Sequence, residues 1–489
     1  MTAGGAPEYD AVVVGAGPNG LVAAATLAGK GWRVLVLEAG AEPGGGLRSA
    51  ELTLPGYVHD VCSAVHPLAL ASPALAALGL NRHGLEWVHP PAPLAHPLDG
   101  GRDAAVLERS VEATAAALGA DARAYRRLVG PLAEAANVLA VAVLSPLTRP
   151  PVAALGDLAR FGIRAGWPAQ TLARRVFRSD EARALLAGLA AHSMLSLRAP
   201  GTAGFGLFLG TLGHRWGWPV ARGGSQSVAN ALAAIVAERG GEIVTGKRVA
   251  SLAELPPARA TLLDVTPRQV LALDDGRLPS QYRRALTRYR YGPGVWKVDW
   301  ALDGPIPWTS MACTRAATVH LGGTLDEIVS AEDDVIRGRN PHRPFVLLSQ
   351  PSVFDPTRAP GGGHTAWAYC HVPNGSTIEM TQRIEAQVER FAPGFRDRIV
   401  GRHTMGPAAL EAHDANYVDG DIGGGHTGLT QLLARPVASR SPWRTPVAGL
   451  YLCSSSTPPG PGVHGMCGWH AATAALADYG NLDDPSLGT

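Results

Sequence analysis

Cysteine is scarce in this sequence of 489 residues. No two cysteines form a CxxC pair, and an odd, dispersed set argues against both a disulfide framework and a zinc site. We therefore expect the protein to work in the reducing cytoplasm, without a bound metal. The five cysteines are Cys62, Cys313, Cys370, Cys453 and Cys467.

An excess of positive charge is also missing. The chain has 43 Lys and Arg residues against 41 Asp and Glu residues, which gives a formal net charge of +2 at pH 7. A protein that binds DNA or RNA needs cationic side chains to neutralise phosphates, and this balance leaves no surplus. We therefore expect no nucleic-acid partner.

The sequence lacks the long apolar run of a membrane span. The uncharged stretch 61–80 contains His66, Pro67 and Pro73, which fits a buried loop and helix better than a span. Residues 1–10 have neither the basic start nor the apolar core of a secretory signal. We therefore expect neither a transmembrane helix nor a cleaved leader.

What the sequence does contain, at its start, is the pattern of a β-α-β unit. Residues 10–14 and 33–38 are short apolar runs typical of strands, and residues 21–30 between them are rich in alanine. Two such strands lie parallel and are joined by a right-handed crossover. This pattern predicts an α/β fold with a Rossmann-type domain.

Distant segments complete the same sheet. Residues 242–245, 260–265 and 449–453 predict further strands, and residues 225–238 and 467–479 predict helices. We therefore expect a discontinuous cofactor-binding domain made of 1–80, 220–267 and 445–489.

The remaining segments mix predicted helices with aromatic-rich strand candidates such as 295–301. We expect them to form a second, discontinuous, mixed α+β domain that binds the substrate. This domain would comprise residues 81–219 and 268–444.

Gly15, Gly17 and Gly20 form a GxGxxG motif directly after the first strand and before the first helix. The first glycine allows a tight turn, the second lets the backbone approach a pyrophosphate, and the third lets helix and strand pack closely. The phosphate then lies at a helix N-terminus. Glu38 ends the second strand, where it can accept hydrogen bonds from a ribose. We therefore predict a dinucleotide site that also includes Pro18, Asn19 and Ala39.

A second glycine-rich segment favours FAD over NAD. Gly44, Gly45, Gly46 and Leu47 precede Arg48, whose guanidinium suits a phosphate. Residues 9–49, the segment Gly223-Gly224-Ser225 and residues 449–472 together resemble the phytoene desaturase-like and amine oxidase-like FAD oxidoreductases. Within that group, the tail LYLCSSSTPPGPGVHGMCG (450–468) is most similar to the bacterial phytoene dehydrogenase-like and PYROXD-type proteins.

This resemblance implies a Rossmann-type fold with bound FAD. It also implies that the backbone N–H groups of Gly465 and Met466 face the pyrimidine edge of the flavin. The sequence departs from the pattern after Val249, where a longer hairpin is common, and at Ser454-Ser455-Ser456, which has no acidic residue near the ribityl chain. The predicted cofactor contacts are Gly15, Gly17, Pro18, Asn19, Gly20, Glu38, Ala39, Gly45, Gly46, Leu47, Arg48, Val249, Ser455, Gly465 and Met466.

Two side chains are candidates for catalysis. Lys297 lies in an apolar, aromatic strand where a buried ammonium is costly, and the segment resembles the amine oxidase strand whose lysine reaches a water at flavin N5. The alternative is an edge-strand lysine paired with Asp299 or Asp303. His464 is either a proton carrier beside the flavin or a side chain that hydrogen-bonds the backbone of a tight loop.

Residues 152–177 combine apolar and basic side chains. They predict either a surface that contacts a membrane and admits a lipophilic substrate, or a pair of helices, interrupted by Pro168, that covers the substrate pocket.

The family resemblance implies an FAD-dependent oxidoreductase that oxidises or desaturates a largely apolar organic molecule by hydride transfer to flavin N5. The sequence has no second β-α-β pattern that carries a GxGxxG motif and no redox CxxC pair, so we expect oxygen, a quinone or a protein as the electron acceptor. Three alternatives stay open: a flavin amine oxidase that uses oxygen, a redox-neutral flavin isomerase, and a flavin-bearing interaction protein without turnover.

Overall fold

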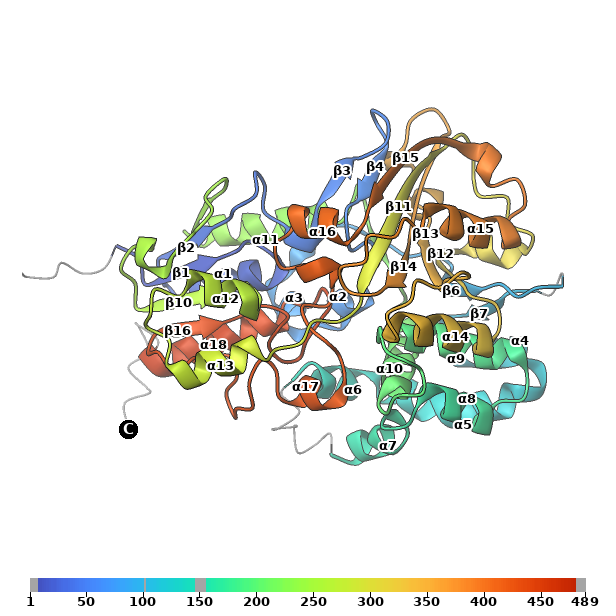
Figure 1. Ribbon diagram of the computed structural model, residues 1–489, viewed down its shortest axis with the longest axis horizontal. Coiled ribbons are helices and arrows are strands. Elements are labelled where there is room, and N and C mark those ends of the chain that lie inside the picture. Colours follow the sequence, from blue (N-terminus) through green and yellow to red (C-terminus); the bar gives the residue numbers. More distant parts are fainter. Residues whose placement is uncertain (1–7, 101–102, 146–154, 481–489) are drawn as a thin grey trace, which may run out of the picture.

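The computed structural model describes residues 8–100, 103–145 and 155–480. Residues 1–7 of the N-terminal segment and residues 152–154 of the 152–177 segment lie outside these ranges. The described chain is organised around two large sheets, which lie in the left and right halves of Figure 1.

The first sheet has five parallel strands in the order β16-β10-β1-β2-β9. Its central strands read AVVV and VLVL and are buried throughout, as is usual for parallel strands covered on both faces. The predicted strands from the two ends and the middle of the chain therefore share one sheet. The strands are β1 (Ala11–Val14), β2 (Val34–Leu37), β9 (Glu242–Val244), β10 (Ala260–Leu263) and β16 (Leu450–Leu452).

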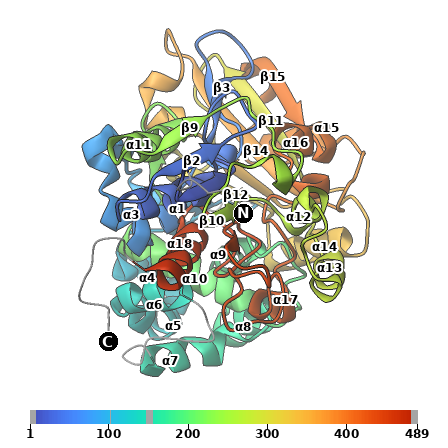
Figure 2. The ribbon, with the colours of Figure 1, turned by 90° about the vertical axis from the view of Figure 1, so that its left-hand side faces the viewer.

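Helices cover both faces of this sheet, with α12 and α13 on one side and α1, α11 and α18 on the other (Figure 2). The first helix begins earlier than its alanine-rich stretch suggests, because Pro18 suits the first helical position. The Rossmann-type α/β fold is confirmed. These helices are α1 (Pro18–Ala28), α11 (Gln226–Glu238), α12 (Pro267–Leu273), α13 (Ser280–Thr287) and α18 (Met466–Tyr479).

The second sheet has seven strands in the order β15-β11-β14-β13-β12-β6-β7, antiparallel except between β12 and β6. Strand β11 lies between β14 and β15, so Lys297 is on an interior strand and not on an edge strand. The strands are β6 (Ala92–His96), β7 (Ala105–Leu107), β11 (Gly294–Leu302), β12 (Ala316–Leu321), β13 (Val346–Ser349), β14 (His364–Val372) and β15 (Ile399–Met405).

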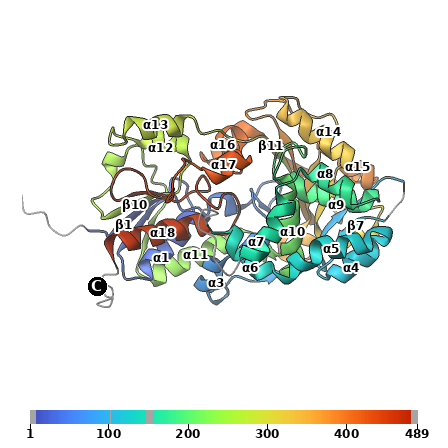
Figure 3. The same ribbon diagram turned by 90° about the horizontal axis from the view of Figure 1, so that it is seen from below.

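Helix α15 packs on one face of this sheet, and α9, α10 and α14 pack on the other. Figure 3, which shows the molecule from below, has α4 to α10 gathered in its right half, in front of the second sheet. These helices are α4 (Val111–Ala117), α5 (Ala122–Glu134), α6 (Ala136–Val143), α7 (Leu155–Ala165), α8 (Ala169–Val176), α9 (Asp180–Ala191), α10 (Thr202–Arg215), α14 (Leu325–Ile336) and α15 (Thr381–Phe391).

Short elements connect the two sheets. The stretch 61–80 contains two short helices, and the 152–177 segment contains α7 and α8, separated at Pro168. Within the described ranges no helix combines the length and the apolarity that a membrane span needs. The remaining elements are β3 (Ser49–Glu51), β4 (Val58–Asp60), β5 (Trp87–Val88), β8 (Val220–Ala221), α2 (Pro67–Ala71), α3 (Pro73–Leu78), α16 (Pro407–His413) and α17 (Leu429–Leu433).

Candidate functional site

The glycine turn joins the carboxyl end of β1 to α1. Gly15 has a φ of +101°, and a Cβ on Gly20 would collide with the carbonyl oxygen of Gly15. Gly468, in α18, packs so closely on α1 that a Cβ there would collide with the carbonyl oxygen of Asn19. The turn and the crossing of these two helices therefore require glycine.

Glu38 ties this turn to the loop that follows β2. One carboxylate oxygen accepts a hydrogen bond from the backbone N–H of Ala16 at 2.7 Å. The other accepts one from Gly40 N–H at 2.7 Å and one from Arg48 at 3.2 Å. The Nε of Arg48 is buried and has no hydrogen-bond partner among the described residues. Glu38 thus holds the backbone in place, and Arg48 keeps a free donor.

The second glycine segment packs directly on the first. Gly44 donates a hydrogen bond of 2.8 Å to the carbonyl oxygen of Ala16. A Cβ on Gly45 would lie 3.1 Å from the Cα of Gly17, and Leu47 is fully buried behind the segment. Two stretches of backbone therefore approach each other without side chains between them.

Two carboxylates that the sequence analysis missed face these glycines. Asp264, directly after β10, accepts a hydrogen bond of 2.8 Å from Gly20 N–H. Burial raises its pKa to about 8, with a smaller contribution from the nearby charges of Asp414 and Glu38. Burial also raises the pKa of Asp414. Asp264 ends a strand as Glu38 does, so its position was readable from the sequence, whereas nothing local marks Asp414.

A cavity of about 620 Å³ begins at the two glycine segments and continues between the sheets. Its walls are mostly apolar and aromatic. Eight predicted site residues line it: Gly17, Pro18, Asn19, Gly45, Gly46, Lys297, Ser455 and His464. Its apolar and aromatic lining includes Phe205, Phe208, Trp218, Leu347, Trp367, Tyr369 and Tyr417.

Lys297 lies at this cavity but is only 2% exposed. Its ammonium forms an ion pair with Asp299 and lies 5.4 Å from the ring centroid of Trp367. His403 and His59 approach the same carboxylate at 3.4 and 3.7 Å. Burial by itself raises the pKa of Asp299, but the charge of Lys297 and the contacts with both histidines hold it below its usual range. The lysine therefore has a structural partner and also a place in the cavity wall.

His464 uses both ring nitrogens to bind the backbone of its own loop. Its Nδ1 accepts a hydrogen bond of 3.0 Å from Met466 N–H, and its Nε2 lies 3.1 Å from the carbonyl oxygen of Gly460. Burial lowers its pKa to about 4. This geometry matches the loop-holding alternative, and the Met466 N–H is engaged by the histidine at the start of α18.

Two other predicted cofactor contacts, Ala39 and Val249, are not among the residues that line the cavity. Ala39 is exposed beyond the end of β2. Val249 packs against the face of the first sheet that carries Val12 and Leu35.

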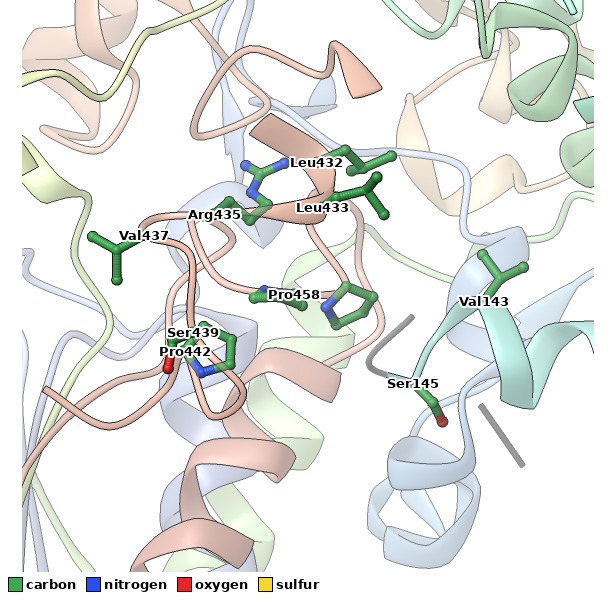
Figure 4. A pocket seen from close by; sticks show the side chains of 10 residues that line it. Val143, Ser145, Leu432, Leu433, Arg435, Val437, Ser439, Pro442 and Pro458 are labelled. Atoms are coloured by element: carbon green, nitrogen blue, oxygen red, sulfur yellow. The ribbon is translucent and has the colours of Figure 1, made fainter. Parts of the chain in front are cut away.

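A second cavity of about 70 Å³ lies beside the large one. Figure 4 shows Leu432 and Leu433 above Pro458, with Val143 and Ser145 across from them. Val143, Leu432 and Pro459 line both cavities. The small cavity is therefore an extension of the same region.

The residues present fit an adenine dinucleotide of the FAD type. The cradle is made of glycines whose Cβ atoms would fill it, and it opens into the large cavity. Arg48 Nε and Asn19 Oδ1, both buried, lack a hydrogen-bond partner within the described chain. A donor and an acceptor beside a helix N-terminus are what phosphate and sugar groups need.

Comparisons with known proteins agree with this geometry. The family model described as NAD(P)-binding Rossmann-like domain matches residues 13–78. A Mus musculus protein, pyridine nucleotide-disulfide oxidoreductase domain-containing protein 2, is 28% identical over 97% of this chain and 94% of its own length. A phytoene desaturase (neurosporene-forming) from Rhodobacter capsulatus is 27% identical over 94% of this chain and 92% of its own.

The fold is also found among solved structures. Putrescine oxidase superposes with a TM-score of 0.62 at 18% identity, covering 96% of this chain and 98% of that one. The predicted resemblance and the predicted cofactor, FAD, are confirmed. The chain is therefore similar, along almost its whole length, to phytoene desaturase-like and PYROXD-type oxidoreductases, and it shares the fold of putrescine oxidase.

Proposed function

We propose that this oxidoreductase oxidises or desaturates a largely apolar organic molecule by hydride transfer to flavin N5. The observation that carries the proposal is the single cavity of about 620 Å³, which runs from the glycine segments to a mostly apolar and aromatic wall. A substrate in this cavity would lie beside the cofactor and be shielded from water, as hydride transfer requires. When bound, FAD supplies the hydride acceptor.

The protein's own residues would bind and orient. We propose that Gly15, Gly17 and Gly20 cradle the pyrophosphate and that Glu38 and Arg48 hold ribose and phosphate. The other proposed cofactor contacts are those predicted from the sequence: Pro18, Asn19, Ala39, Gly45, Gly46, Leu47, Val249, Ser455, Gly465 and Met466. The proposed domains have the predicted bounds, 1–80, 220–267 and 445–489 for FAD, and 81–219 and 268–444 for the substrate, although α12 and α13 of the last segment pack on the first sheet.

Lys297 and His464 have different proposed roles. Lys297 would hold positive charge in the cavity wall near the reacting end of the flavin, with Asp299 fixing its position. His464 would keep the loop before α18 in shape, which supports a positioning role better than proton transfer.

The electron acceptor is proposed to be oxygen, a quinone or a protein.

The proposed location is the cytoplasm, with peripheral contact to a membrane through α7. Leu155 and Ile163 of this helix are 51% and 65% exposed, while Phe161 of the same helix lines the cavity. An apolar substrate could then pass from lipid into the cavity along one helix.

Anaerobic bleaching of the flavin tests the proposed function. The FAD-loaded protein is mixed with a panel of medium-length isoprenoid hydrocarbons, straight-chain esters and primary amines, and the flavin absorbance is followed. We expect bleaching by an apolar C–H donor, with a product two hydrogens lighter by mass spectrometry. If only amines bleach the flavin, the proposal is wrong.

An amine oxidase is the second candidate. Trp367 and Tyr369 line the cavity as a stacked pair, with ring centroids 5.7 Å apart and an interplanar angle of 11°, and paired aromatic rings suit an amine. Reduction by amines with release of hydrogen peroxide would favour it. Turnover only after photoreduction would identify an isomerase, and a flavin that no small molecule reduces would identify an interaction protein.

A further inference from the structure

Three buried histidines, His96, His320 and His371, lie behind one wall of the large cavity, and a half-buried fourth, His192, is part of that wall. His192 lines the cavity, and its Nε2 lies 3.0 Å from the Nε2 of His320. The ring of His320 makes an edge contact with His96, with centroids 6.4 Å apart. The ring of Phe345 contacts both His320 and His371, so His371 belongs to the same group. This group reaches the cavity through His192.

The end of α9 offsets part of the cost of a positive charge on His192. This residue follows the last turn of α9 (Asp180–Ala191), where the carbonyl end of the helix dipole stabilises an imidazolium. Two residues later, Met194 has a φ of +54° and packs with Cys62 and Tyr417. Because the Tyr417 hydroxyl lies against Gly46, this bend brings the end of α9 close to the cofactor loops.

The histidines behind His192 offer a place for a proton. His96 Nε2 lies 2.8 Å from the carbonyl oxygen of Gly323, so His96 donates there and its Nδ1 is a bare acceptor. The Nδ1 atoms of His96 and His320 have no hydrogen-bond partner in the described part of the chain. Both point to Gly188, where a Cβ would lie 2.7 Å from His320 Nδ1 and 3.1 Å from His96 Nδ1.

The charges around this group are few. His371 Nδ1 lies 2.9 Å from both carboxylate oxygens of Glu332. Burial lowers the pKa of His192 to about 3 and that of His96 to about 4, and it lowers the pKa of His320 well below its usual value. The three imidazoles are therefore neutral near pH 7, and each has one ring nitrogen without a proton.

We propose that His192 is the catalytic base of a desaturation, with His320 as the residue that positions it. The inference rests on the proposed function and narrows it. One C–H bond of the substrate breaks with both electrons leaving as hydride to FAD. The C–H bond on the adjacent carbon breaks with its proton moving to Nδ1 of His192, and its electron pair becomes the new C=C bond.

The hydrogen bonds of the group fit this role. With Nδ1 of His192 bare, its Nε2–H donates to His320 Nε2, and His320 then carries its proton on Nδ1, near Gly188. A proton arriving at His192 can therefore be passed one ring further from the cavity. A weak base is enough, because the loss of hydride leaves the adjacent C–H bond strongly acidic.

The test compares variants in the anaerobic bleaching assay described above, with the isoprenoid and straight-chain panel as probe. His192→Phe should slow bleaching by the active compound at least about 100-fold while FAD binding persists. In His192→Ala, added imidazole should restore part of the rate. His320→Leu should slow bleaching less. Both Phe and Leu variants should show a larger isotope effect than wild type with substrate deuterated at the proton-losing carbon.

His214→Gln is the matched control. His214 is also a buried histidine, hydrogen-bonded to Tyr125 at 2.7 Å among the helices below the second sheet. This variant should lose stability without changing the bleaching rate or the isotope effect.

The outcomes are distinguishable. If no panel compound bleaches wild type, the proposed function fails, and the inference fails with it. If wild type is bleached and His192→Phe reacts equally fast, or if both variants keep the wild-type isotope effect, the inference alone is overturned and the histidines serve only in packing.

Discussion

The carboxylate of Asp264 accepts a hydrogen bond from the backbone N–H of Gly20, 2.8 Å away. An acidic side chain therefore lies at the turn where the proposed site receives the pyrophosphate of FAD. Two anionic groups so close together are compatible only if one is protonated or screened. The raised pKa of Asp264, about 8, means that the neutral form is the resting form near pH 7.

This arrangement predicts a pH dependence of stability and of FAD binding. Aspartate in an unfolded chain titrates near pH 4, so between about pH 4 and pH 8 the folded protein holds the extra proton. The free energy of unfolding of the apoprotein should therefore fall as the pH rises through this window. FAD should also bind more weakly above pH 8. Thermal melts and FAD titrations from pH 5 to pH 9 measure both trends.

Asp264→Asn provides the comparison, since an amide oxygen can still accept from Gly20 N–H. We expect this variant to melt higher than wild type at pH 8 by at least about 2 °C, with a flatter pH profile of FAD affinity. Identical pH profiles for the two proteins would show that Asp264 stays ionised.

Lys297→Met is expected to lower stability and to slow reoxidation by oxygen. Without the ammonium, Asp299 is left as a buried charge with only two histidines nearby, and such a loss costs about 3–5 kcal/mol. The missing positive charge should slow reoxidation of the reduced flavin at least about tenfold.

Lys297→Met combined with Asp299→Asn separates the two effects. The double variant should recover stability and keep the slow reoxidation in stopped-flow measurements. If its reoxidation returns to the wild-type rate, Lys297 serves only as the partner of Asp299.

Gly468→Ala should abolish FAD binding or folding. The added Cβ would collide with the carbonyl oxygen of Asn19, at the helix N-terminus that faces the cofactor. Overpacking of this kind costs about 1–3 kcal/mol or more, and here the backbone itself must move. The matched control is Gly130→Ala in α5, where a Cβ meets nothing within 4 Å and a small gain in stability is expected. Flavin content after gel filtration and melting temperature are the readouts.

Glu38→Ala should weaken FAD binding at least about tenfold, a change of roughly 1.4 kcal/mol. Its carboxylate accepts two backbone N–H groups of the cofactor loops, so its loss removes loop order together with the proposed ribose contacts. Glu42→Ala, at an exposed position of the same loop, should bind FAD as wild type does. Fluorescence titration of the apoproteins measures the difference. Equal affinities for the two variants would contradict the role of Glu38.

NADH and NADPH should reduce this flavin slowly or not at all, because the sequence predicts only one β-α-β unit that carries a GxGxxG motif. Anaerobic stopped-flow mixing with either nucleotide provides the measurement. Bleaching as fast as that by the best panel substrate would refute the expectation.

The parts of the site that local sequence encodes could be predicted, and the parts made by packing could not. The spacing of Gly15, Gly17 and Gly20 between a strand and a helix predicts a tight turn, and the structure has this turn. Asp414, which follows α16, lies beside Gly45 because segments far apart in the sequence pack together. No local sequence pattern predicts that contact.

Lys297 and His192 illustrate the same limit. Alternation along a strand puts residues two apart on one face, so the pairing of Lys297 with Asp299 could be foreseen as one of two alternatives. The pairing of His192 with His320 joins a helix end to a strand 128 residues away, and single-sequence reasoning has no signal for it.

The arrangement of the first sheet bears on how the protein is made. Strands β1 and β2 are synthesised early, but β16 and α18, which pack beside β10 and α1, are synthesised last. During translation, the glycine turn therefore emerges long before the helix that closes it from the other side. Apolar surface on α1 stays uncovered until then, which makes the incomplete chain prone to aggregation. A ribosome that stalls before Gly468 would release a chain with the FAD motif present and its cradle incomplete.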